Sequence, residues 1–511
     1  MDPVDVLVVG GGINGAGIAR DLAGRGLAVV LVEQDDLAAH TSSASTKLIH
    51  GGLRYLEYYE FSLVRKALAE REVLLRAAPH IIRPLRFVMP HDPSMRPVWM
   101  IRAGLFLYDH LARRELLPAS RTVQLAEHPA GAPLQPRFTK GFVYSDAWVD
   151  DARLVVLNAV DAAAHGARVH TRTRCVHARA EGGAWRVQLE GDGGAPPVLT
   201  CRAIVNAAGP WAAQFLHGAL GKTDTKALRL VKGSHVVVLR IFTHDHAYIF
   251  QNADGRIIFA IPYEERFTLI GTTDVEWHGE PAAVRIDDGE IAYLCEQASR
   301  YFAQPVRTAD VVWSYSGVRP LIDDESGNPA AVTRDYRLEL TREAGAPLLS
   351  VWGGKITTFR KLAEQAADDL CGALVHGGRA WTERAPLPGG DLSGWIAPSG
   401  RPDTDIARFA DALAQRAPQV AASTRARWAR SYGALAGRIL DRGALGAEVA
   451  PGLHEAELHY LREHEWARSA DDVLWRRSKL GLHLSPAQRQ AVADWWAAHS
   501  DSARSPARAC S

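Results

Sequence analysis

Six cationic or imidazole side chains lie in segments whose other residues are mostly small or apolar. They are His50, Arg54, His235, Arg319, Arg334 and Lys355. An arginine guanidinium binds phosphate in a bidentate geometry, and a lysine adds a mobile positive charge. A histidine has an unperturbed pKa near ~6.5, so it can accept the proton of an alcohol. Side chains of these types could bind an anion and accept a proton, and an ordinary surface charge is the alternative for each cation.

His50 and His235 are both candidates for the base. His50 precedes Arg54 by four residues, so the two side chains would share a helix face if this segment is helical. His235 lies in a segment with the alternating pattern of a strand. A packed or surface histidine is the alternative for each, and the sequence does not rank them.

A glycine-rich turn near the start of the chain must position such a site. Gly10, Gly12 and Gly15 follow the apolar run Val4–Val9 and open a helical pattern. The first glycine permits a tight turn, the second lets the backbone approach a pyrophosphate, and the third lets helix and strand pack closely. Glu33 ends the next apolar run and can accept hydrogen bonds from a ribose. The pattern predicts a strand–helix–strand unit that binds a dinucleotide at the helix N-terminus.

Two further segments favour FAD over NAD. Thr41–Lys47 (TSSASTK) is rich in hydroxyl groups that can line an extended pyrophosphate and ribityl chain. Gly353–Thr358 (GGKITT) opens a helix, and a helix N-terminus aimed at a flavin stabilises the negative charge that develops on reduction. A solvated loop and an ordinary glycine turn are the respective alternatives.

Length and composition bound the architecture. The 511 residues are too many for one compact core, so two or three domains are expected. A hydrophobic fraction of 47% and a charged fraction of 23% are those of a globular protein. With 59 basic and 58 acidic side chains, the net charge of +1 does not indicate nucleic acid as a partner.

Cysteine spacing and the N-terminus indicate a cytosolic protein. The five cysteines are Cys175, Cys201, Cys295, Cys371 and Cys510. No pair has C-x-x-C spacing, so no zinc site or other metal site and no disulfide framework is predicted. Asp2 and Asp5 stand where an export signal is basic, and no apolar stretch approaches the roughly 18 residues of a membrane span.

Hydrophobic periodicity predicts how the chain is divided. Short alternating strands between residues 231 and 275 indicate an antiparallel sheet inserted into the nucleotide-binding domain. Residues 385–400 are dense in proline and glycine and mark a domain boundary. The chain beyond it is predicted to be helical, with capping boxes at Ser469 with Asp472 and at Ser485 with Gln488.

The predicted fold is therefore α/β, with three parts. A Rossmann-type FAD-binding domain takes residues 1–60, 145–230 and 336–385, an antiparallel-sheet substrate domain takes residues 61–144 and 231–335, and an all-helical C-terminal cap domain takes residues 386–511.

Along almost its whole length the chain resembles the aerobic, FAD-dependent glycerol-3-phosphate dehydrogenases. Besides the glycine turn and Glu33, the resemblance is carried by Thr41–Glu57 (TSSASTKLIHGGLRYLE), which is far more specific than a glycine pattern. The other matching segments are Ala69–Leu74, Tyr144–Leu154, Asn206–Trp211, Lys232–His235, Gly271–Asp274, Tyr315–Pro320, Thr333–Tyr336 and Gly353–Lys361, with His464–Arg468 and Asp471–Lys479 in the cap domain.

The resemblance implies a function and its partners. The expected reaction oxidises sn-glycerol 3-phosphate to dihydroxyacetone phosphate and passes the electrons from FAD to a membrane quinone. The expected enzyme is a homodimer, bound peripherally to the cytoplasmic face of the membrane. No motif suggests a covalent flavin, so non-covalent FAD is expected.

The resemblance also implies site residues. The catalytic candidates are His50, Arg54, His235, Arg319 and Lys355, and the substrate-binding candidates are Arg54, Tyr55, His235, Arg319, Arg334 and Lys355. Tyr55 either bonds to the substrate or packs against the flavin. The FAD contacts are expected from Gly10, Gly12, Ile13, Asn14, Gly15, Glu33, Thr41, Ser42, Ser43, Ser45, Lys47, Leu48, His50, Gly51, Gly52, Ala208, Gly209, Gly354, Lys355, Ile356 and Thr357.

Val98–Leu111 is an apolar helical segment bounded by arginines. It is predicted either to lie among lipid headgroups with its apolar side buried or to be a helix of the protein core.

Three alternatives to a quinone-linked dehydrogenase stay open on the sequence. A glycerol-3-phosphate oxidase would share the pocket and use oxygen as the acceptor. An FAD-dependent amine oxidase that acts on an N-methyl amino acid would need side chains that bind the substrate carboxylate, but not several cations for a phosphate. A flavin-stabilised scaffold needs no such polar set at all.

Overall fold

The computed structural model describes residues 4–93, 95–223, 228–252, 254–322 and 335–499. The chain forms two compact units. The first contains the described residues up to Ala77 together with Ile82–Ala385, and the second contains Ala78–Ile81 and the residues from Pro386 onward. Among the described helices, none is long and apolar enough to cross a membrane.

The first sheet of unit 1 carries the predicted dinucleotide turn. Its strands are β1 (Val4–Val9), β2 (Val29–Val32), β7 (Arg168–His170), β8 (Thr173–Glu181), β9 (Ala184–Gly191), β10 (Val198–Asn206), β17 (Arg337–Glu343) and β18 (Ala346–Trp352). The order β17-β18-β10-β1-β2-β7 has a parallel centre, with β17 antiparallel at one edge and the β8–β9 hairpin joined to β10. Because helices and other segments cover both faces, β1 and β2 are nearly continuous apolar runs.

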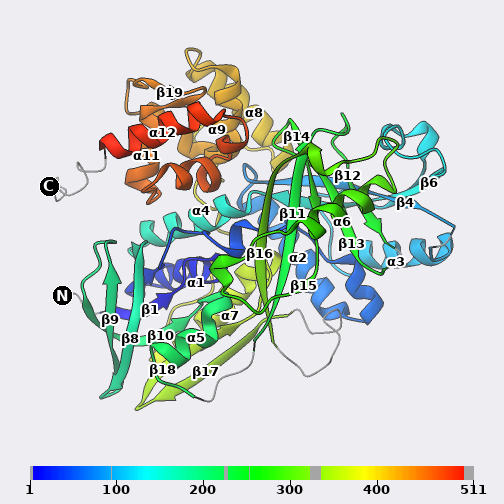
Figure 1. Ribbon diagram of the computed structural model, residues 1–511. Coiled ribbons are helices and arrows are strands. Elements are labelled where there is room, and N and C mark those ends of the chain that lie inside the picture. Colours follow the sequence, from blue (N-terminus) through cyan, green and yellow to red (C-terminus); the bar gives the residue numbers. More distant parts are fainter. Residues whose placement is uncertain (1–3, 94, 224–227, 253, 323–334, 500–511) are drawn as a thin grey trace. The chain divides into compact units, whose positions relative to one another are not determined.

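Seven α-helices are described in unit 1. They are α1 (Ile13–Gly24), α2 (Phe61–Ala77), α3 (Val98–His110), α4 (Asp151–Ala164), α5 (Ala212–Gly218), α6 (Asp288–Ser299) and α7 (Phe359–Leu374). Helix α1 packs against both α4 and α7, while α5 and α7 lie along β18 (Figure 1). This covering of a mostly parallel sheet by helices confirms the predicted α/β class.

The second sheet of unit 1 contains the antiparallel strands predicted between residues 231 and 275. Its strands are β3 (Leu48–Ile49), β4 (Ile82–His91), β5 (Arg121–Gln124), β6 (Lys140–Val149), β11 (Leu228–Leu239), β12 (Ala247–Gln251), β13 (Ile257–Tyr263), β14 (Phe267–Gly271), β15 (Val275–Glu276) and β16 (Val311–Ile322). The long strands β11 and β16 run side by side (Figure 1). Strands β12 and β4 form a parallel pair that the sequence did not predict.

One prediction about a helix is resolved by burial. Helix α3 buries only Leu105 and Tyr108, whereas Trp99 is 69% exposed and Phe106 is 60% exposed. The interpretation of α3 as a buried core helix is therefore wrong. Periodicity identified the apolar side of this helix but not whether protein covers it.

Unit 2 is mainly helical. Its α-helices are α8 (Pro402–Arg416), α9 (Ala422–Tyr432), α10 (Ala436–Leu440), α11 (Glu455–His464) and α12 (Pro486–His499), and a π-helix spans Asp472–Arg477. Reciprocal hydrogen bonds confirm the capping boxes at Ser469 with Asp472 and at Ser485 with Gln488. A short ribbon of β19 (Glu448–Ala450) and β20 (Leu453–His454) departs from the all-helical prediction, because Gly452 adopts a positive φ between them.

The division of unit 1 into a FAD-binding and a substrate-binding domain stays a prediction. The four described cysteines are buried and free.

Candidate active site

The glycine turn between β1 and α1 has the geometry that a bound pyrophosphate requires. Gly10 has a φ of +112°, and a Cβ atom on Gly15 would lie 1.9 Å from the carbonyl oxygen of Gly10. Only glycine therefore fits at either position. Gly12 is the N-cap of α1 and has extended backbone, so the first turn of the helix faces the end of β1. The N–H groups at this helix end favour negative charge.

Glu33 stands beside this turn at the end of β2. Its carboxylate accepts hydrogen bonds from the backbone N–H of Gly11 at 2.6 Å and of Asp35 at 2.8 Å. Burial raises the pKa of the Glu33 carboxyl, and these two N–H donors oppose that rise. The carboxylate is thus oriented by the backbone, as a ribose-binding acid requires.

One cavity of about 650 Å³ joins this turn to the antiparallel sheet. Most of the predicted site residues line it: Gly10, Gly12, Ile13, Asn14, Glu33, Thr41, Ser42, Ser45, Leu48, His50, Tyr55, Ala208, Gly209, His235, Arg319, Gly354, Lys355, Ile356 and Thr357. The structure therefore gathers residues between positions 10 and 357, from both sheets, around one space.

Six predicted residues that the structure describes do not line this cavity: Gly15, Ser43, Lys47, Gly51, Gly52 and Arg54. A Cβ atom on Gly15 or Gly51 would clash with neighbouring protein atoms, and Gly52 has a φ of +75°. The guanidinium of Arg54 donates to the hydroxyl of Tyr58 at 3.4 Å. Arg334 lies outside the described residues, so its predicted role stays untested.

Arg319 and Lys355 bring positive charge to the cavity from β16 and from the loop after β18. Arg319 donates to the carbonyl oxygen of Thr273 at 3.2 Å and forms an ion pair with Asp274. The ammonium of Lys355 lies 3.8 Å from the centre of the Tyr55 ring. Tyr55 therefore holds Lys355 by a cation–π contact.

His235 lies on β11, as predicted, and is 2% exposed. Its Nε2 lies 2.9 Å from the hydroxyl of Thr46, and its Nδ1 is buried without a hydrogen-bond partner among the described residues. The ring stacks on Tyr315 with centroids 4.8 Å apart. Burial lowers the pKa of His235 well below 6.5, and the positive charges of Lys47 and Arg319 lower it further. The imidazole is therefore neutral at pH 7.

His50 also lines the cavity, but it does not share a helix face with Arg54. The short 3₁₀ helix of this segment begins only at Leu53, after Gly52 has turned the backbone into the left-handed region. The predicted pairing on one helix is therefore wrong. The backbone N–H of His50 donates to the hydroxyl of Thr357 at 3.2 Å, which ties the segment to the start of α7.

Lys47 does not line the cavity and belongs to a buried polar network. Its ammonium donates to Asp151 at 2.7 Å and to the carbonyl oxygen of Ser43 at 3.0 Å, and both charged side chains are at most 1% exposed. Asp151 also accepts from the hydroxyl of Ser45 at 2.7 Å. This buried network fixes the polar loop Thr41–Lys47 in place.

Several residues of this site were not assigned a role from the sequence, among them Thr46, Asp274 and Tyr315. Thr46 lies in the hydroxyl-rich run, and the other two lie in segments that carry the family resemblance. Their partners are distant in sequence, and only that resemblance could have singled them out.

The residues fit FAD. Asn14 donates from Nδ2 to the carbonyl oxygen of Gly353 at 3.1 Å, while its Oδ1 is buried without a hydrogen-bond partner among the described residues. A Cβ atom on Gly354 would lie 2.9 Å from the Asn14 side chain. Such an unsatisfied acceptor in a glycine-lined space is expected where a dinucleotide supplies the missing donor.

Two family models match the chain. The model described as FAD dependent oxidoreductase matches residues 5–360, and the model described as C-terminal domain of alpha-glycerophosphate oxidase matches residues 380–500.

Three relatives of similar length match nearly the whole chain. A glycerol-3-phosphate dehydrogenase of Pseudomonas aeruginosa is 54% identical over 95% of this chain and 93% of its own length. A D-erythritol 1-phosphate dehydrogenase of Brucella abortus is 50% identical over 96% of this chain and 97% of its own length. The aerobic glycerol-3-phosphate dehydrogenase of Escherichia coli is 50% identical over 97% of each chain.

Solved structures share the fold. The glycerol-3-phosphate dehydrogenase of Bacillus halodurans, complexed with FAD, superposes with a TM-score of 0.77 at 28% identity and covers 98% of this chain and 91% of its own. The L-alpha-glycerophosphate oxidase of Mycoplasma pneumoniae, with FAD bound, has a TM-score of 0.60 at 19% identity, and the match covers 76% of this chain and 100% of its own.

Proposed function

The chain belongs to the FAD-dependent oxidoreductases that carry the C-terminal domain of alpha-glycerophosphate oxidase, and on that premise we propose that it oxidises sn-glycerol 3-phosphate to dihydroxyacetone phosphate. The observation that carries the proposal is the shared cavity. Arg319, Lys355 and the neutral imidazole of His235 line the same space as the dinucleotide turn. A secondary alcohol with a phosphate group needs this combination of cations and base.

His235 is the proposed base. In the tautomer whose Nε2–H donates to Thr46, Nδ1 is the unprotonated nitrogen that accepts the proton of the substrate hydroxyl. As that proton leaves, the electron pair of the adjacent C–H bond departs as hydride and the carbonyl of dihydroxyacetone phosphate forms. When bound, FAD supplies the two-electron acceptor for this hydride. The lowered pKa of His235 keeps Nδ1 available at neutral pH.

Arg319 and Lys355 are the proposed phosphate ligands. Arg319 is held by Asp274 and the carbonyl oxygen of Thr273, so its guanidinium is oriented before the substrate binds. Lys355 is held against the ring of Tyr55. Ordered cations lose less side-chain entropy when they bind an anion than exposed ones do.

The anaerobic visible spectrum of the purified holoenzyme tests this function. The flavin absorbance should bleach promptly with sn-glycerol 3-phosphate but not with glycerol, which lacks the phosphate, or with sarcosine, an amine-oxidase substrate. D-erythritol 1-phosphate belongs in the same series because a relative of 50% identity is named for that substrate. If only D-erythritol 1-phosphate bleached the flavin, that compound would be the substrate in place of sn-glycerol 3-phosphate. An unchanged spectrum with both compounds would refute the proposed function.

An exposed apolar surface supports peripheral attachment to a membrane. It is formed by side chains of three neighbouring elements, the 3₁₀ helix Leu53–Tyr58, the start of α2, and α3. Its members are Tyr58, Tyr59, Phe61, Trp99, Met100, Phe106 and Leu107. Aromatic side chains of this kind are enriched where protein meets lipid headgroups.

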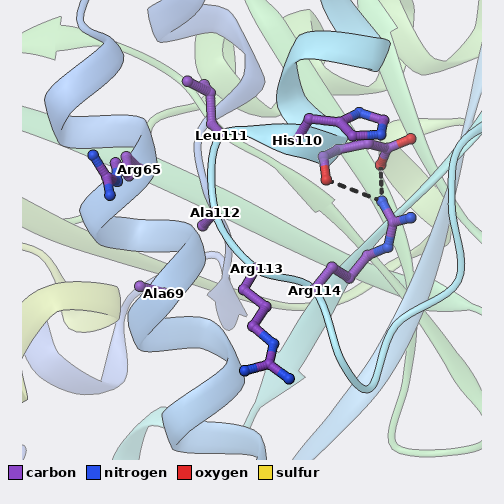
Figure 2. Close-up of a pocket in the computed structure, with 8 residues that line it drawn as sticks. Arg65, Ala69, His110, Leu111, Ala112, Arg113 and Arg114 are labelled. Carbon is purple, nitrogen blue, oxygen red and sulfur yellow. Dashed lines mark hydrogen bonds and ion pairs between the residues drawn. The ribbon is translucent and has the colours of Figure 1, made fainter.

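Basic side chains lie next to this apolar surface. Figure 2 shows Arg65 on α2 opposite Arg113 and Arg114, which follow α3, around a second cavity of about 600 Å³. Arg114 pairs with Asp109 at 2.8 Å, and Arg113, whose side chain is 88% exposed, pairs with Glu115 at 2.9 Å. Positive charge beside apolar side chains favours the anionic cytoplasmic face of a membrane.

We further propose that a membrane quinone receives the electrons and that the enzyme is a homodimer. Quinone reduction without catalase-sensitive oxygen uptake would support the quinone and exclude the oxidase alternative. Light scattering on the detergent-free holoenzyme distinguishes a dimer from a monomer.

A further inference from the structure

Four basic side chains converge on one face of the antiparallel sheet, away from the active-site cavity. Arg86 of β4 stands opposite Ser145 of β6, and Arg121 of β5 stands opposite Val143 of the same strand. Ser145 and Val143 are two residues apart, so both arginine side chains project from the same face.

Two histidines complete this cluster. Strand β12 pairs with β4 through Ala247 and Phe87, and one residue earlier the same register places His246 beside Arg86. The ring of His128 contacts the ring of His246 edge to face, with centroids 4.9 Å apart. Segments far apart in the sequence therefore bring four basic groups together.

Among the described residues, the two guanidinium groups have no carboxylate partner. Neither Arg86 nor Arg121 forms an ion pair with any residue that the structure describes. Arg86 reaches only the carbonyl oxygen of Ala119, at 3.5 Å, and its Nε is buried without a hydrogen-bond partner in the described part of the chain. A buried donor of this kind loses its hydration without replacement, and in native proteins it calls for a partner.

The two imidazoles also have ring nitrogens that could bind a ligand. His128 accepts from the backbone N–H of Ala130 at Nδ1, so its Nε2 carries the hydrogen and is a donor. Nδ1 of His246 is buried without a hydrogen-bond partner in the described structure. His244 does not belong to this cluster, because both of its ring nitrogens have partners. Its Nδ1 accepts from the backbone N–H of His246, and its Nε2 lies 2.8 Å from the hydroxyl of Tyr248.

The pKa values of Arg86 and His246 show that nearby carboxylates do not balance the positive charges of this cluster. Burial lowers the pKa of Arg86, and the charge of Arg121 lowers it further against a weaker opposite effect of Asp109. Burial, with His128 and both arginines, lowers the pKa of His246 to about 4, and Asp245 opposes this only weakly. Asp109 is itself engaged by Arg114 and Ser120.

We propose that Arg86, Arg121, His128 and His246 form a second anion site, which binds a phosphoryl group and is distinct from the active site. None of the four residues lines the active-site cavity. A phosphate monoester matches the geometry of two guanidinium groups, and neutral imidazole N–H groups supply further donors. The phosphoryl group belongs either to a free anion or to a phospholipid headgroup.

Binding of radiolabelled inorganic phosphate to the holoenzyme tests the site. The Arg319→Gln background weakens phosphate binding at the active site. In that background the double variant Arg86→Gln with Arg121→Gln should bind phosphate roughly 100-fold more weakly, because two charge-assisted contacts are lost. The matched control Arg168→Gln with Arg186→Gln replaces two exposed arginines on the other sheet and should leave binding unchanged.

Vesicles distinguish the two sources of the phosphoryl group. If the group belongs to a lipid, the Arg86→Gln, Arg121→Gln variant should lose co-sedimentation with vesicles that contain phosphatidylglycerol, relative to the arginine control. If it belongs to a free anion, only phosphate binding should fall. The proposal is overturned if the double substitution changes neither phosphate binding nor vesicle binding. Flavin bleaching by substrate is read separately, so failure here leaves the proposed function in place.

Discussion

His235 and Thr46 are joined by a contact of 2.9 Å between the imidazole Nε2 and the threonine hydroxyl, although the two residues lie 189 positions apart. This contact fixes the imidazole ring and leaves Nδ1 as the nitrogen available for proton transfer. His235→Asn should therefore lower the rate of flavin reduction by substrate about 10²- to 10⁴-fold, the usual contribution of a general base. Anaerobic stopped-flow absorbance measures this rate.

His50→Gln is the matched control, because His50 also lines the cavity. A larger loss for His50→Gln than for His235→Asn would reverse the assignment of the base. The pH profile gives a second readout. Since burial and nearby cations lower the pKa of His235, kcat/KM should stay level from pH 8 to 6.5 and fall only at lower pH. A decline that already begins above pH 6.5 would contradict the proposal.

Arg319→Gln should weaken substrate binding. A hydrogen bond to a charged group contributes about 1.5–3 kcal/mol, so KM for the phosphate substrate should rise roughly 10- to 150-fold. Arg319→Lys should recover only part of this loss, because an ammonium cannot reproduce the bidentate fork. Steady-state kinetics with a soluble dye acceptor measures KM and kcat. An unchanged KM in Arg319→Gln would remove Arg319 from the phosphate site.

Gly15→Ala should abolish FAD binding. The added Cβ atom would lie 1.9 Å from the carbonyl oxygen of Gly10, so the turn that receives the pyrophosphate must open. The flavin content of the purified protein, read from the ratio of visible to ultraviolet absorbance, should fall to near zero. Gly372→Ala is the control, since nothing lies within 4 Å of its Cβ position in α7. Normal flavin content in Gly15→Ala would show that the turn does not hold the cofactor.

Lys47→Met should destabilise the fold because it leaves the carboxylate of Asp151 buried without its partner. Removing one partner of a buried ion pair lowers the free energy of unfolding by about 3–5 kcal/mol. The double variant Lys47→Met with Asp151→Leu should lose less of this free energy, because no unpaired charge stays buried. Urea unfolding of the holoenzyme, followed by flavin fluorescence, measures the three variants in a double-mutant cycle. Additive losses would show that the pair is not coupled.

The parts of the site that could be predicted from the sequence are those set by local geometry. The glycine turn and Glu33 depend on a single strand–helix–strand unit, whose spacing is fixed. The contact of Thr46 with His235 brings the loop before β3 to β11 of the same sheet, and periodicity does not encode which distant segments meet. The pairing of His50 with Arg54 was wrong because Gly52 turns the backbone before the helix begins.

Helix α3 shows the same limit and leads to the last prediction. Its apolar pattern was visible in the sequence, but only the structure shows that Trp99 and Phe106 are exposed. If these side chains insert among lipid headgroups, Trp99→Ser with Phe106→Ser should weaken co-sedimentation with phosphatidylglycerol vesicles at least roughly tenfold, since two large apolar side chains lose their burial in lipid. Leu239→Ser, which alters a side chain of similar exposure at the end of β11, should have no effect. Equal vesicle binding by all three proteins would show that α3 does not contact the membrane.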